Sequence, residues 1–81
     1  MKKYYKVLGY YYCVTYYKNG HIKSVVKVVE SPEKQILYIS GKDFSRPFLK
    51  RCLPSTRDEF LKHYIAIACL FGDAIGSTES I

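Results

Sequence analysis

Cysteine and histidine are the residue types of this chain that could support covalent chemistry. The sequence holds three cysteines, Cys13, Cys52 and Cys69, and two histidines, His21 and His63. A cysteine nucleophile needs a base within hydrogen-bonding reach. His21 flanks a predicted turn while Cys13 points toward the presumed core. His63 precedes Cys69 by six positions, which is about 240° of rotation round a helix. The sequence therefore predicts no catalytic residue and no enzyme.

The spacing of potential ligands matches none of the common metal or cofactor motifs. No pair of Cys or His stands at C-x-x-C, H-x-x-x-H or H-E-x-x-H spacing. The glycine patterns of P-loops, dinucleotide-binding turns and nucleophile elbows are also missing. Asp58 and Glu59 are adjacent acids at the start of a predicted helix, where the helix dipole and capping account for them. We expect neither a metal nor a cofactor.

Positive charge is concentrated in the N-terminal part of the sequence. Thirteen lysines and arginines stand against seven acids, for a net charge of +6. The first 29 residues contain six lysines and no acid, whereas the rest of the chain holds seven basic and seven acidic residues. A field of one sign attracts phosphate backbones, anionic surfaces or an acidic protein face. The charge alone therefore leaves the class of partner open.

The first half of the chain predicts three antiparallel strands. Residues 3–17 are rich in tyrosine and valine, which predicts one long strand. Asn19-Gly20 predicts a type I′ hairpin turn, because this turn needs a positive φ at both central positions. A second strand over 22–30 and a third over 35–40 follow.

The second half predicts a packed loop and then a helix. Residues 41–54 include two prolines, which interrupt regular structure. Three apolar side chains are expected to hold this loop on the core: Phe44, Phe48 and Leu49. Thr56 and Glu59 have the spacing of a capping box and predict the helix start, and Gly76 predicts its end.

These elements predict an α+β fold, a three-stranded antiparallel β-β-β meander with one C-terminal helix packed on one face. The length of 81 residues leaves room for one domain. We place this domain at residues 1–76 and a mobile C-terminal tail at 77–81.

The sequence also predicts where the protein resides. The longest uncharged apolar run, residues 64–71, is far shorter than the roughly 20 residues needed to cross a bilayer. Tyrosines and a lysine follow the initial Met-Lys-Lys where the apolar region of a secretory signal would lie. The three widely spaced cysteines fit reduced thiols better than a disulfide framework. We expect a cytoplasmic protein with no membrane contact.

The register of the Asn-Gly hairpin predicts which sheet face meets the helix. A two-residue loop pairs Cys13 with Val26 on one face and Tyr12 with Lys27 on the other. The helix is expected on the face of Cys13, because burying lysines without anionic partners costs several kcal/mol. The opposite face is then expected to look outward, and it is too apolar for ordinary exposure to solvent. Its predicted partner-binding residues are Tyr10, Tyr12, Tyr16, Lys23 and Lys27.

Three hypotheses about function follow from this surface. The first is a small binding module that contacts another protein, or a second copy in a homodimer, in the manner of a phage or mobile-element inhibitor or adaptor. The second is a nucleic-acid-binding protein, in which arginines of the loop contact bases because arginine can bind guanine with two hydrogen bonds. Its candidate residues are Lys18, Lys23, Lys27, Arg46, Lys50 and Arg51. The third is a stable domain whose basic face is merely solvated.

Overall fold

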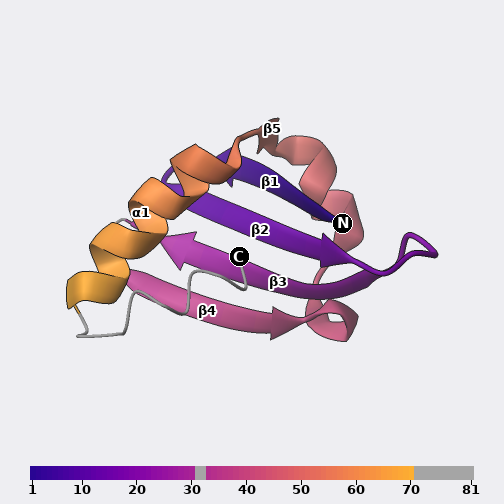
Figure 1. Cartoon of the computed structure of the whole chain (residues 1–81). Helices are drawn as coiled ribbons and strands as arrows, with labels where there is room; N and C mark the ends of the chain where they lie inside the picture. The colour runs from indigo at the N-terminus through magenta and orange to yellow at the C-terminus, as the bar shows by residue number, and fades with distance from the viewer. Residues whose placement is uncertain (31–32, 71–81) are drawn as a thin grey trace.

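The computed structural model describes residues 1–30 and 33–70, which form an antiparallel sheet and one α-helix (Figure 1). The sheet has five strands in the order β4-β3-β2-β1-β5. The α+β class, the antiparallel sheet and the C-terminal helix are confirmed, but the prediction of three strands is wrong. The elements are β1 (Lys2–Val7), β2 (Tyr10–Tyr16), β3 (Ile22–Val29), β4 (Gln35–Ser40), β5 (Leu53–Pro54) and α1 (Arg57–Leu70), with the 3-10 turns η1 (Gly41–Asp43) and η2 (Arg46–Arg51).

The two additional strands have separate origins. The predicted long strand over 3–17 is broken by a two-residue turn, because Val7 pairs with Tyr10 and leaves Leu8 and Gly9 between them. These two residues have φ values of 34° and 83°, the positive values that a type I′ turn requires. The other strand, β5, lies within the predicted loop and pairs with β1 at the edge of the sheet.

The second hairpin has the predicted pairing along most of its length. Cys13 pairs with Val26 and Tyr12 pairs with Lys27, as expected. The turn itself differs, because the Gly20 amide donates to the Tyr17 carbonyl over 3.0 Å and Gly20 alone in this turn has a positive φ, of 88°. This is a three-residue loop closed by a glycine bulge, not a type I′ turn.

A break in register next to the turn changes the face on which Lys23 lies. Tyr16 pairs with Ile22 and Thr15 pairs with Ser24, which leaves Lys23 as the extra residue of a β-bulge. Ile22, as the partner of Tyr16, packs on the face of Tyr12. Lys23 instead borders a hollow on the helix side together with Cys13. The prediction that Lys23 shares a face with Tyr12 is therefore wrong.

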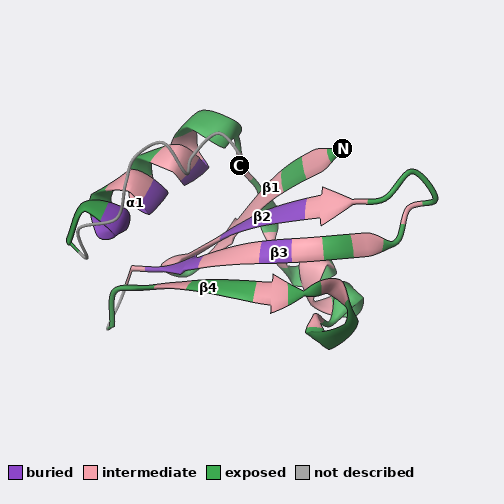
Figure 2. Cartoon of the chain, turned by 60° about the horizontal axis from the view of Figure 1, so that its bottom comes forward, coloured by how far each residue is buried: buried purple, intermediate pink, exposed green. Residues whose placement is uncertain are grey.

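Helix α1 packs against the predicted face of the sheet (Figure 2). Its buried residues Phe60, Tyr64, Ile67 and Ala68 form one core with Cys13 and Val28. The predicted cap is confirmed, since the Thr56 hydroxyl oxygen accepts a hydrogen bond from the Glu59 amide over 3.2 Å. The predicted helix end at Gly76 and the tail over 77–81 lie outside the described residues. No helix in the described part of the chain is long and apolar enough to span a membrane.

A second core lies on the opposite face of the sheet, beneath η1 and η2 (Figure 2). Tyr12 is only 2% exposed there. Its ring centroid lies 5.9 Å from that of Phe44 and 5.5 Å from that of Phe48. The prediction that the loop packs on the core is confirmed. The prediction that this tyrosine-rich face looks outward is wrong, because the chain's own residues 41–52 cover it.

Gly41 allows η1 to approach the sheet closely. A Cβ atom at this position would collide with the carbonyl oxygen of Ile22 in β3. Any larger residue would push η1 away from β3, and the aromatic side chains that follow would leave the second core. This glycine therefore sets the position of the whole segment that covers the face.

Candidate anion-binding site

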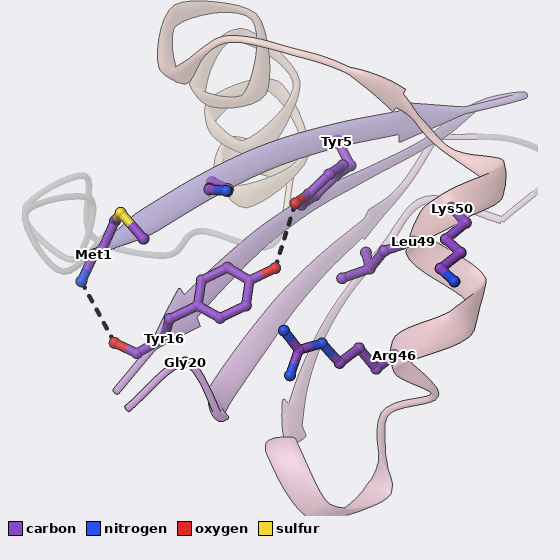
Figure 3. Close-up of a pocket in the computed structure, with 8 residues that line it drawn as sticks. Met1, Tyr5, Tyr16, Gly20, Arg46, Leu49 and Lys50 are labelled. Carbon is purple, nitrogen blue, oxygen red and sulfur yellow. Dashed lines mark hydrogen bonds between the residues drawn. The ribbon is translucent and has the colours of Figure 1, made fainter. Parts of the chain in front are cut away.

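A hollow of about 360 Å³ lies between β1, the end of β2 and η2 (Figure 3). The hydroxyl groups of Tyr5 and Tyr16 point toward each other, and Arg46 extends toward Tyr16 from η2 (Figure 3). Lys50 lies along η2 at the border of the hollow. Its volume is within the range of small-molecule sites, about 300 to 1,000 Å³. Among the described residues, its lining consists of Met1, Lys3, Tyr5, Tyr16, Gly20, Arg46, Leu49 and Lys50.

Strand alternation and a 3-10 turn bring these residues together. Side chains alternate along β1, so Lys3 and Tyr5 both lie on the face away from α1. In η2, residues three apart lie on the same side of the turn, which places Arg46 beside Leu49. Leu49 packs into the second core. This packing holds η2 on the sheet and fixes Arg46 at the rim of the hollow.

Two tyrosine hydroxyls form the floor of the hollow. The hydroxyl oxygens of Tyr5 and Tyr16 lie 3.3 Å apart, and either can be the donor. Burial, and after it the hydrogen bond with Tyr5, raises the pKa of Tyr16 to about 12. The Tyr16 hydroxyl group is therefore protonated at neutral pH. Because one proton is shared between the two oxygens, the accepting tyrosine keeps its own O–H free to donate to a ligand.

The start of the chain is held beside this floor by its backbone. The Tyr16 amide donates to the Met1 carbonyl over 2.8 Å. The Met1 nitrogen donates in turn to the Tyr16 carbonyl over 3.4 Å (Figure 3). These bonds extend the pairing of β1 with β2 by one residue and keep Lys3 in register with the hollow.

The charged side chains around the hollow are all cationic. Lys3, Arg46 and Lys50 line it, and none of its lining residues is an acid. Among the described residues, these three cations take part in no ion pair, since the two ion pairs present are Lys6–Glu59 and His63–Glu30. The Lys3 ammonium lies 6.0 Å from the centroid of the Tyr16 ring. A site made of N–H and O–H donors with uncompensated positive charge is suited to an anion.

The basic surface continues beyond this hollow. Arg46 also borders a neighbouring hollow, of about 390 Å³, whose lining includes Tyr17, His21 and Lys42. Tyr17 is 53% exposed and presents its ring to solvent at the hairpin. We call the combined surface the basic end of the molecule, and define it by Lys3, Tyr17, His21, Lys42, Arg46 and Lys50.

The residues predicted to bind a partner are not gathered in one site. Tyr10, Tyr12 and Lys27 lie together, with the Lys27 ammonium 4.8 Å from the Tyr10 centroid and 5.9 Å from the Tyr12 centroid. Burial raises the pKa of Tyr12 to about 12, as expected for a core residue. Tyr16 instead belongs to the hollow, and Lys23 lies on the helix side of the sheet.

The residues predicted to bind nucleic acid are partly brought together. Arg46 and Lys50 share the hollow, and Lys18 is exposed in the hairpin turn. Arg51 borders a separate hollow beside Phe48. Sequence reasoning missed Lys3 and Tyr5. Recognising the turn at Leu8 and Gly9 would have revealed them, because pairing across that turn places Tyr5 opposite Tyr12.

The surroundings of Cys13 and His63 are typical of residues with a structural role. Burial raises the pKa of the Cys13 thiol, which makes it a poor nucleophile at neutral pH. His63 stacks on Tyr11 at 3.9 Å between ring centroids, and its Nδ1 atom lies 2.7 Å from a Glu30 carboxylate oxygen. Within residues 1–30 and 33–70, no three potential ligands cluster in a way that could hold a metal ion. The absence of catalysis stays a prediction.

Comparison with known proteins adds no family to this description. No protein-family model matches the chain, and neither a curated protein nor a solved structure is significantly similar to it. The function is therefore inferred from the geometry and chemistry of the hollow and the surface around it.

Proposed function

We propose that this chain is a small non-catalytic module that binds nucleic acid through its basic end. The observation that carries the proposal is that Lys3, Arg46 and Lys50 line one hollow whose described lining includes no acidic side chain. Contacts with phosphates supply most of the affinity of proteins for nucleic acids. These three cations form no ion pair within residues 1–30 and 33–70, so no described contact has to break before they neutralise phosphates.

The aromatic part of the basic end favours a single strand over a duplex. Proteins that bind single strands combine a basic groove with exposed aromatic rings on which bases stack, at about 1 to 3 kcal/mol per base. Tyr17 is an exposed ring next to Arg46, on the border of the neighbouring hollow. Bases in a duplex are already stacked on one another and offer no face to such a ring. We therefore propose single-stranded DNA or RNA as the ligand.

The surroundings of the thiols support a role without catalysis. Burial raises the pKa values of Cys13 and Cys52. Neither thiol lines the hollow, and the polar side chains of its described lining are hydrogen-bond donors, with no carboxylate or imidazole base among them. In a binding role, all the polar side chains that line the hollow can act as donors to the ligand.

The test is fluorescence anisotropy with a labelled 12-nucleotide single strand, as DNA and as RNA, at 50 and 200 mM salt. If several phosphates are contacted, we expect affinity to fall by about tenfold or more over this range. Lys50→Glu should weaken binding strongly. Lys62→Glu is the matched control, because Lys62 is an exposed lysine of α1. Equal losses in both variants would mean that net charge alone attracts the strand, and no binding at either salt concentration would refute the proposal.

A second candidate function, contact with another protein, is favoured by the free edge of β4. Among the described residues β4 pairs with β3 alone, and Gln35–Ser40 contains no charged residue and no proline. Edge strands usually carry such residues to prevent pairing with other chains. Leu37 and Tyr38 are 41% and 68% exposed there. A second copy could add its own β4 in antiparallel orientation and form an isologous dimer, and an inhibitor or adaptor could use the same edge.

Sedimentation velocity over a hundredfold range of protein concentration tests the second candidate. Dimerisation through β4 predicts a sedimentation coefficient that rises with concentration, and Leu37→Lys should abolish the rise. Leu53→Lys is the matched control, because Leu53 is 63% exposed and lies in β5 at the other edge of the sheet. A constant monomeric value, or equal effects of both substitutions, would exclude pairing through β4.

A further inference from the structure

We infer that the hollow between β1 and η2 binds the terminal phosphate of a nucleic-acid strand. The inference rests on the proposed function and specifies the part of the ligand that enters the hollow. Three properties of the hollow carry it: the number of cations, the free hydroxyl donor and the apolar wall.

The number of cations matches a phosphate monoester better than an internal phosphodiester. A monoester carries a charge of about −1.5 to −2 at neutral pH and offers three strong acceptor oxygens. A diester within the strand has one negative charge and two unbridged oxygens. Lys3, Arg46 and Lys50 converge on a single hollow, whereas a continuous backbone would be followed by cations spread along a groove.

The donors of the hollow match the acceptor oxygens of the same group. The Arg46 guanidinium is planar and can donate two parallel hydrogen bonds to one phosphate. The paired hydroxyls of Tyr5 and Tyr16 provide one O–H that is not used between them. With the ammonium groups of Lys3 and Lys50, the hollow offers donors on opposite sides, from the sheet and from η2 (Figure 3).

The rest of the hollow has room for the nucleotide that carries the phosphate. A volume of about 360 Å³ exceeds what a phosphate group alone would fill. Leu49, Met1 and the tyrosine rings give the hollow an apolar wall. The sugar of the terminal nucleotide would lie against this wall, and the strand would leave past Arg46 toward Tyr17 in the neighbouring hollow.

The experiment compares three labelled 10-nucleotide strands of one sequence with the wild-type protein at 150 mM salt. The strands carry a 5′ phosphate, a 3′ phosphate or a hydroxyl at both ends, so that they also identify the end recognised. We expect at least one phosphorylated strand to bind roughly tenfold more tightly than the hydroxyl strand. The preference should shrink between pH 7.5 and pH 5.5, because the second ionisation of a monoester has a pKa of about 6.

Substitutions locate the preference within the hollow. Arg46→Gln should bring the affinity ratio of phosphorylated to hydroxyl strand close to one, and Tyr16→Phe should reduce it. Arg51→Gln is the control for the loss of an arginine from η2, because Arg51 borders a different hollow. Equal affinity for all three strands would overturn this inference while leaving the proposed function intact. A preference that survives Arg46→Gln would also overturn it, and failure of every strand to bind would refute both proposals.

Discussion

Tyr12→Ala is expected to remove a large part of the protein's stability, because this ring occupies the centre of the second core. Tyr12 is 2% exposed, and its centroid lies within 6 Å of two phenylalanine rings, at 5.9 Å from Phe44 and 5.5 Å from Phe48. Truncating a buried aromatic side chain to alanine costs about 3 to 5 kcal/mol. A chain of this size has a total stability on the order of 4 to 12 kcal/mol. The substitution therefore removes about a quarter of the stability or more.

The assay is urea unfolding followed by circular dichroism, with Tyr17→Ala as the matched control. Tyr17 is 53% exposed, so the same change there should cost less than about 0.5 kcal/mol. At about 4 to 8 °C per kcal/mol, the melting temperature of Tyr12→Ala should fall by more than about 12 °C. If Tyr12→Ala does not fold, Val14→Ala gives a milder test at the same face, with an expected loss of roughly 2 kcal/mol.

The outcome that would refute this reasoning is a similar, small loss in the two tyrosine variants. Such a result would mean that η1 and η2 do not cover the face of Tyr12, and that this face is open to solvent or to a partner. It would also remove the support for the hollow, because Leu49 holds Arg46 in place by packing into the same core.

Three further measurements test other parts of the structure. Leu8→Asn should stabilise the protein by about 1 kcal/mol, which would be measured as a higher urea midpoint. Leu8 is 93% exposed and has a φ of 34°, which asparagine tolerates better than leucine. A lower midpoint would contradict the turn. Thr56→Ala should cost about 1 kcal/mol in the same assay through loss of the helix cap, and an unchanged midpoint would contradict the cap. Burial raises the pKa values of Tyr12 and Tyr16 to about 12 from an ordinary value near 10, so their contribution to stability is complete below pH 10 and is lost as the pH rises to 12. Urea midpoints between pH 8 and 12 check this, and a midpoint independent of pH would contradict it.

The sequence was informative where local rules and tertiary packing agree. Apolar alternation around Asn19 and Gly20 was sufficient to predict the pairing of Cys13 with Val26 and the face that α1 covers. The capping residues at Thr56 predicted the helix start for the same reason. The hairpin pairing and the helix cap depend on residues close together in the chain, so local preference and final structure coincide there. The face that α1 covers follows from the hairpin pairing, because that pairing decides which apolar side chains need a cover.

The first hairpin could not be predicted because its turn contradicts local preference. Leucine rarely adopts a positive φ, and nothing in a run of tyrosines, valines and lysines marks Leu8 as a turn residue. Pairing of β1 with β2 on one side and with β5 on the other supplies the energy that holds this conformation. Because this turn was not predicted, the sequence did not show that Lys3 and Tyr5 line the hollow.

The tyrosine-rich face is covered, as its apolar character requires, but the cover comes from the same chain. Phe44, Phe48 and Leu49 close over Tyr12 and its neighbours, just as α1 closes over the other face. With both faces covered, Lys3, Arg46 and Lys50 lie at the rim where η2 meets β1. Burying a lysine or arginine without an anionic partner is costly, so these three cations stay at the edge of the second core instead of entering it. The candidate site is thus a consequence of how a small chain covers a sheet on both sides. The sequence alone could not predict it, because the site brings together residues about 45 positions apart, such as Tyr5 and Lys50.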